Sequence, residues 1–298
     1  MLNFLLASAF IIIPSVIIAE AKQDGWMVIV LATVTGIGIA LLYTALGLRF
    51  PRQTLVQYAQ LILGKIPGKT VGLLFMWFAL HLGALVLRNF GDFMVITLMP
   101  ETPRILFHVS IMLIVALALY GGIEVLCRFN GFVTPIFVIS IVLLILLTVT
   151  IKDFDLNNLL PFLENGFIPV LKSSLIPISF PFGETVLFTM ILPYINKPEE
   201  AKKNHVVAMI GAGILLTLIT MAVLSVYGAG AANYLYSTYT LSRNISIAAI
   251  IERIEVIPVS VWILSGLIKI AVCLYAFVTG SAQILNLKDY RPSSSLRE

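Results

Sequence analysis

Long apolar runs without a single charge are the feature that most limits what this chain can fold into. Residues 26–48 contain no Asp, Glu, Lys or Arg, and neither do residues 129–151. A helix of about 20 apolar residues crosses a bilayer. Lipid cannot hydrogen-bond the backbone, so such runs are expected to be helices, whereas a β-barrel would show short alternating strands. The sequence therefore predicts an all-α, polytopic membrane protein.

The rest of the composition agrees with this prediction. Of 298 residues, 59% are hydrophobic and 11% are charged, with a mean hydropathy of +1.02, whereas a soluble domain carries about a quarter charged residues. The Lys and Arg residues are scattered at the ends of the apolar runs, so the net charge of +4 does not indicate nucleic acid binding. We expect eight spans, at about 2–19, 26–48, 70–97, 104–121, 129–151, 172–195, 205–227 and 256–283.

Basic residues in the connections predict how the chain is oriented in the membrane. If the N-terminus is cytoplasmic, the inside connections and tail hold eleven Lys and Arg residues and the outside connections hold six. An excess on the inside favours this orientation. Two outside connections, 152–171 and 228–255, are long, and the second ends in an amphipathic run from Ile245 to Val256. They form either a lid over a binding site or interfacial helices.

Two of the spans contain residues that weaken a helix. The first has Pro14-Ser15 after a run of small residues, and the sixth reads Pro-Ile-Ser-Phe-Pro-Phe-Gly-Glu from Pro177 to Glu184. Proline removes an intrahelical hydrogen bond, and in a membrane the freed carbonyl must be packed in protein or line a wet cavity. Helices broken at the bilayer centre are common substrate sites in transporters. The alternative is a plain proline kink.

Four charged residues are expected inside the spans. Glu184 follows the proline-rich break, and a carboxyl group at that depth indicates a functional site by default. Arg88 and Asp92 are one turn apart in the third span and can pair. Lys269 has no acid in its own span, so its partner must come from elsewhere. We therefore hypothesise a shared ionic site among the third, sixth and eighth spans.

Nothing in the sequence supports catalysis. There is no His-Glu-x-x-His run, no phosphate-binding glycine loop and no plausible Ser/His/Asp set. The two cysteines, Cys127 and Cys273, lie within or beside apolar runs, so neither a disulfide framework nor a metal site is expected. We expect no cofactor and no enzymatic activity.

Six stretches give the chain a family resemblance. It resembles the B subunit of bacterial endospore germinant receptors, the amino-acid-permease-like spore germination proteins. The stretches run in family order over nearly the whole chain: Pro14-Ser15 with Ala19–Asp24, Leu87–Phe93, Leu98–Pro103, Leu160–Gly166, Ser179–Glu184 and Asn286–Pro292. Together they are specific, although each alone is weak.

The resemblance implies a fold and a function. The family is similar to the amino acid–polyamine–organocation superfamily, with a LeuT-like fold of ten spans in two inverted repeats whose first and sixth helices are broken. It implies a subunit that acts with A and C subunits in the spore inner membrane, within membrane lipid. An amino acid or similar small-molecule germinant, bound between the broken helices, would trigger germination.

The resemblance also assigns a ligand-binding site. Its walls would be Ala7, Ser8, Ala9, Phe10, Leu80, Gly83, Ser179, Phe180, Phe182, Gly183 and Glu184. The first span has Ala-Ser-Ala where the family usually has glycine, which leaves the substrate class open. The resemblance implies two more spans after the position of Pro292.

The resemblance therefore implies one transmembrane domain over 1–298 with about eight of ten helices. Residues 1–151 would form the first repeat and 152–298 an incomplete second repeat. A secondary transporter coupled to protons or cations, and a non-functional truncated paralogue, stay open as alternatives.

Overall fold

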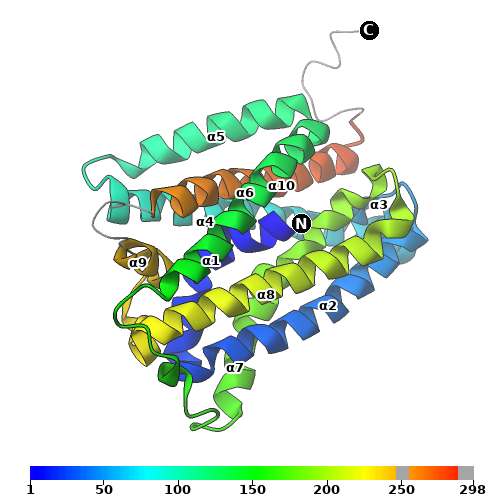
Figure 1. The fold of residues 1–298 in the computed structure, drawn as a ribbon. Helices are drawn as coiled ribbons and strands as arrows, with labels where there is room; N and C mark the ends of the chain where they lie inside the picture. The colour runs from blue at the N-terminus through cyan, green and yellow to red at the C-terminus, as the bar shows by residue number, and fades with distance from the viewer. Residues whose placement is uncertain (246–254, 288–298) are drawn as a thin grey trace. The chain divides into compact units, whose positions relative to one another are not determined.

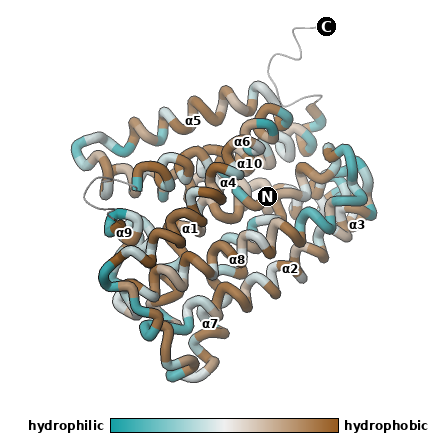
Figure 2. Tube along the Cα trace, in the orientation of Figure 1, coloured by the Kyte–Doolittle hydropathy of each residue, from teal (hydrophilic) through white to brown (hydrophobic). Residues whose placement is uncertain are grey.

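The computed structural model of the chain describes residues 1–245 and 255–287 (Figure 1). Within these ranges the regular structure is helical throughout, without a strand. Among the described residues, six helical stretches are long and apolar enough to cross a membrane. Apolar residues follow these helices, and polar residues gather at their ends and in the connections (Figure 2). The chain is an all-α polytopic membrane protein.

The predicted spans agree closely with the helices that the structure contains. The first two spans form one continuous helical stretch, Leu2–Arg49, and the sixth is absent from the six long stretches because its helix is broken. Residues 246–254 of the predicted amphipathic run, and residues 288–292 of the last resembling stretch, lie outside the described residues. The long helices are α1 (Leu2–Ala21), α2 (Gly25–Arg49), α4 (Lys65–Phe93), α5 (Arg104–Gly121), α6 (Ile123–Thr148), α8 (Ala201–Tyr227) and α10 (Val256–Ile284).

Shorter segments join the long helices. Those of α-type are α3 (Leu55–Leu63), α7 (Ile168–Pro177) and α9 (Ser237–Asn244). Those of 3₁₀ or π type are η1 (Lys22–Asp24), η2 (Met94–Leu98), η3 (Leu156–Leu159), η4 (Ile178–Phe182), η5 (Gly183–Met190), η6 (Leu192–Tyr194), η7 (Pro198–Glu200) and η8 (Gly228–Asn233).

The described chain divides into two compact units. The first comprises Met1–Leu41, Phe132–Thr185 and Lys203–Ser265. In it, α1 packs against α7, η4, α9 and η8. Fifteen of the 20 residues of α1 are buried, so this helix is the core of the unit.

Two of the stretches that carry the resemblance bind each other in the first unit. The Gln23 side chain donates hydrogen bonds to the Pro161 carbonyl and to Glu164, at 2.9 and 3.0 Å. The amide of Leu163 donates to the buried Asp24 carboxylate at 2.9 Å. The short segment η1 therefore anchors the connection 152–171 at one end of α1.

The second unit comprises Leu42–Gly131, Val186–Lys202 and Gly266–Glu298. Its α3 was not predicted as a helix; it begins with a capping box in which the side chain of Gln57 accepts from the amide of Thr54. The returning α4 packs so closely on α3 that a Cβ at Gly68 would collide with the backbone of Gln60. Helix α5 packs on α4 as well.

Candidate functional site

The sixth predicted span is broken in the structure, as the sequence predicts. Helix α7 ends at Pro177, the π segment η4 follows, and a 3₁₀ segment, η5, begins at Gly183. The break lies at Phe180, whose backbone is extended (φ −136°, ψ 109°). Pro177 and Pro181 have no amide hydrogen, so the helical hydrogen-bond ladder cannot pass through this segment. The span is therefore two short half-helices.

Glu184 lies at the start of the second half-helix. It is the second residue of η5, and only 3% of its surface is exposed. The N-terminal end of a helical segment carries a partial positive charge, which favours a carboxylate there. The adjacent Phe182 is fully buried, and Gly36 of α2 lies against it without room for a Cβ. Helix α2 thus holds the break in place from one side.

The first span, in contrast, is not broken. Helix α1 runs without interruption from Leu2 to Ala21 with Pro14 inside it, so the prediction of a broken first helix is wrong. Pro14 cannot bond the carbonyl of Phe10, four residues earlier, and the hydroxyl of Thr238 in α9 donates to that carbonyl instead, at 2.8 Å. A side chain from a distant part of the sequence, and not a ligand, satisfies the freed group.

The other predicted residues of α1 also lie in the core of the first unit. Ala7, Ser8 and Ala9 are buried, and Phe10 meets Phe137 of α6 edge to face with ring centroids 5.6 Å apart. Helix α1, which contains these residues, packs on both α7 and η4 of the broken span. Of the predicted residues in η4, Ser179 is exposed and Phe180 is half-buried.

One buried polar residue of this region, Ser173, is not among the residues predicted from the sequence. It lies in α7 four residues before Pro177, so its carbonyl has no amide donor at the usual helical position. Its hydroxyl is buried and has no hydrogen-bond partner within the described residues. The sequence shows only a serine four residues before a proline, between Lys172 and Ser174, and does not indicate that its hydroxyl lacks a partner.

The predicted residues of the third span lie in the second unit. Leu80 and Gly83 line a cavity of about 160 Å³, together with residues of α5 and α10, and none of its lining residues is polar. Lys269 of α10 is fully buried. It lies between Gly266, which packs against Phe90 of α4, and Cys273, which packs against Gly83.

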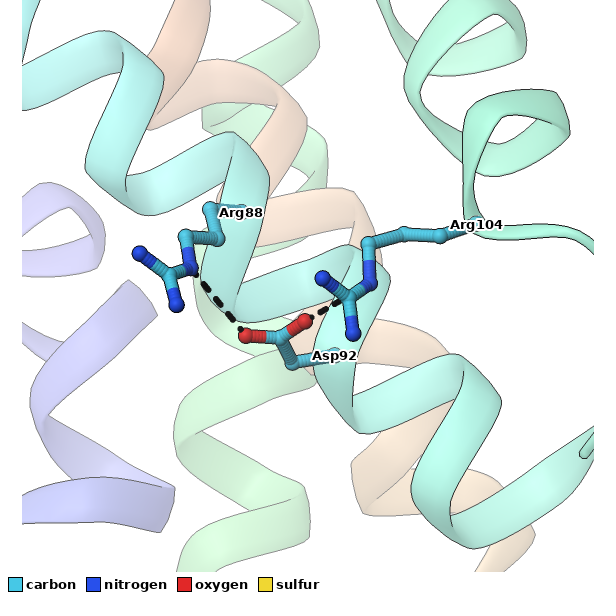
Figure 3. Close-up of polar contacts among 3 residues, drawn as sticks. All are labelled: Arg88, Asp92 and Arg104. Carbon is cyan, nitrogen blue, oxygen red and sulfur yellow. Dashed lines mark ion pairs between the residues drawn. The ribbon is translucent and has the colours of Figure 1, made fainter.

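Asp92 binds two arginines in the second unit, not one. Its carboxylate lies 3.5 Å from Nε of Arg88, the predicted partner in the same helix, and 2.8 Å from Nε of Arg104 at the start of α5 (Figure 3). The Asp92 side chain is 21% exposed, compared with 67% and 47% for Arg88 and Arg104. The wider ionic site that includes Glu184 and Lys269 stays a prediction.

These features define a class of protein: a polytopic helical membrane protein with a discontinuous span and a buried carboxylate at the break. Comparison with known families identifies it further. The chain belongs to the spore germination protein family, whose family model matches residues 1–294.

Individual relatives have the same family name. The chain is 28% identical to spore germination protein KB of Bacillus subtilis (strain 168). The aligned region of 291 residues covers 96% of this chain and 76% of the relative. It is 26% identical to spore germination protein YndE of the same organism, over 96% of this chain and 79% of the relative. Spore germination protein A2, also from that organism, is 27% identical over 88% of this chain and 72% of the relative.

Proposed function

We propose that this chain is the membrane-embedded germinant-binding subunit of a spore nutrient receptor. It would bind an amino acid or similar small molecule and act with A- and C-type subunits in the spore inner membrane to trigger germination. The observation that carries the proposal is the break at Phe180, followed by buried Glu184 at the start of a half-helix, in a member of the spore germination family.

The chemistry of the break at Phe180 suits a zwitterionic ligand. A buried carboxylate attracts an ammonium group, and an interrupted helix has backbone groups available for a carboxylate. Buried α1, which packs on η4, would form one wall of the site. Binding would shift a conformational equilibrium of this subunit, and the partner subunits would respond to that shift. A LeuT-like arrangement of inverted repeats, with the N-terminus in the cytoplasm, is part of the same proposal.

Replacing the buried carboxylate tests the proposal. Spores that carry Glu184→Gln in the complete receptor are expected to need at least tenfold more germinant for a half-maximal germination rate, a loss of about 1.4 kcal/mol of binding free energy or more. Glu199→Gln, at an exposed position before α8, is the matched control and should leave the response unchanged. Equal protein levels are checked by immunoblot, and binding by NMR on the purified complex. A normal response of the Glu184→Gln spores would reject the role of this residue.

The transporter alternative has its own test. A receptor subunit needs only to bind its ligand, whereas a secondary transporter moves it across the membrane. Proteoliposomes that contain the chain alone are therefore expected to show no uptake of labelled amino acids above empty liposomes. Robust uptake driven by a proton or cation gradient would establish transport instead.

A further inference from the structure

An apolar groove runs along one face of α4 in the second unit. Leu80, Gly83 and Ala84 form its wall on α4, Met112 lies on the α5 side, and Ile270 lies on the α10 side. Glycine and alanine leave the depression open, and Leu80 beside them is 44% exposed. Because the cavity of about 160 Å³ has no polar lining residue, a soluble polar molecule has nothing there to bind.

The groove ends at a charged cluster. One turn beyond Leu87, the last lining residue of α4, Gly91 lies in close contact with His108 and the stem of Arg104, so the two helices meet and close the groove there. Arg88, Asp92 and Arg104 surround this closed end (Figure 3). Two guanidinium groups and one carboxylate leave one net positive charge, on arginine side chains that are 67% and 47% exposed.

Helix length places the two parts at different depths. Helix α5 has 18 residues and is therefore about 27 Å long, close to the thickness of the hydrocarbon layer of about 30 Å. If α5 spans the bilayer, its first residue, Arg104, lies at the headgroup level, and Met112, eight residues later, lies near the middle. The cationic cluster and the apolar groove thus match the two ends of one amphiphile.

From this arrangement we infer that the α4–α5 groove binds one anionic phospholipid, with an acyl chain along Leu80, Gly83 and Ala84 and the phosphate at Arg88 and Arg104. Arginine is well suited to phosphate because its planar guanidinium donates paired, charge-assisted hydrogen bonds. Asp92 contacts both arginines through Nε and so holds them beside each other. The terminal nitrogens of Arg88 point away from the carboxylate (Figure 3).

Native mass spectrometry of the purified full chain in detergent tests this site. The chain is titrated with phosphatidylglycerol, with zwitterionic phosphatidylcholine, and with glycerol phosphate as a headgroup without acyl chains. We expect one phosphatidylglycerol adduct, favoured about tenfold over phosphatidylcholine, which corresponds to about 1.4 kcal/mol. Glycerol phosphate should not displace it at the same concentration.

Exposed positions allow variants that retain the fold. The double variant Arg88→Gln with Arg104→Gln should abolish the preference for phosphatidylglycerol. Ala84→Phe, which fills the groove, should weaken the binding of both lipids. Arg128→Gln is the matched charge control, because Arg128 is 79% exposed and pairs with Glu124 at 2.6 Å four residues away. Leu117→Phe, at a position 74% exposed on α5, is the matched volume control.

Three results would overturn the inference. The first is equal binding of the two phospholipids by the unaltered chain, which would exclude headgroup recognition. The second is an effect of Arg128→Gln as large as that of the double variant, because it would indicate general attraction to anionic lipid. The third is displacement by glycerol phosphate, which would identify a soluble anion site.

Discussion

Pro14 has no amide hydrogen, so the carbonyl of Phe10 must find its donor outside α1. The Thr238 hydroxyl supplies it at 2.8 Å, and beside it the amide of Ser237 donates to the Ser15 hydroxyl at 3.0 Å. All four residues of these two bonds are buried. The Thr238 side chain thus replaces the hydrogen bond that Pro14 cannot donate, and the backbone of the adjacent Ser237 binds the residue after the proline, while α1 continues without a break.

Replacing Thr238 by valine, which has nearly the same shape, tests this compensation. We expect Thr238→Val to destabilise the protein by about 1–2 kcal/mol, because it leaves a buried carbonyl without a donor. Thermal unfolding in detergent, measured by circular dichroism, should show a lower midpoint. Thr240→Val is the control: Thr240 is on the same helix but bonds only the Tyr236 carbonyl one turn earlier, at 3.2 Å. Equal effects of the two variants would contradict the assigned role of Thr238.

At the level of helix packing, the absence of a side chain at Gly36 allows α2 to lie close to the broken span. A Cβ added at Gly36 would lie 2.8 Å from Cβ of Phe182, closer than packed side chains allow, whereas a Cβ at Gly38 would meet nothing within 4 Å. Phe182 is fully buried in η4. The two glycines lie two residues apart on α2, but Gly36 is buried against Phe182 whereas Gly38 is exposed.

Alanine at these two positions should act in opposite directions. Gly36→Ala overpacks the contact with Phe182 and should cost about 1–3 kcal/mol. Gly38→Ala removes backbone freedom without a clash and should stabilise the helix by up to about 1 kcal/mol. The unfolding midpoints of the two variants are expected to lie on either side of that of the unaltered protein. A lower midpoint for Gly38→Ala alone would refute the packing argument.

The long helices could be placed from the sequence because each one contains a long apolar run. The length of the run and the polar residues at its ends are visible without knowledge of the packing. The break at Phe180 was predictable for the same reason, since two prolines and a glycine lie within seven residues. The continuity of α1 was not, because the compensating Thr238 is 228 residues away from Phe10 along the chain. The short helix α3 was not predictable in this way, because it is amphipathic and, with nine residues, too short to give the hydrophobic run of a span.

The candidate site was predictable only in part, for related physical reasons. Arg88 and Asp92 share a helix, so their pairing follows from spacing alone. Arg104 belongs to the next helix, and its ion pair depends on how α5 packs on Gly91. For Ser173, the relevant fact is a missing partner, which only a structure can reveal.

For the whole molecule, the distribution of basic residues predicts which side of the membrane each connection faces. Arg128 and its neighbour Cys127 then belong to the cytoplasmic side, and the connection 152–171 to the opposite side. The chain has two free cysteines, of which Cys127 is exposed and Cys273 is buried. The native sequence therefore carries one accessible thiol at a position that reports the orientation.

A membrane-impermeant maleimide should label Cys127 in inside-out vesicles and fail to label it in right-side-out vesicles. Cys127→Ser should abolish labelling in both, because the second thiol, Cys273, is 0% exposed. Adding Asn157→Cys to Cys127→Ser gives the reverse reporter, since Asn157 is exposed in the connection 152–171. Its labelling should occur only in right-side-out vesicles. If Cys127 were labelled only in right-side-out vesicles, the N-terminus would lie outside, and the eleven basic residues assigned to the cytoplasm would face the opposite side.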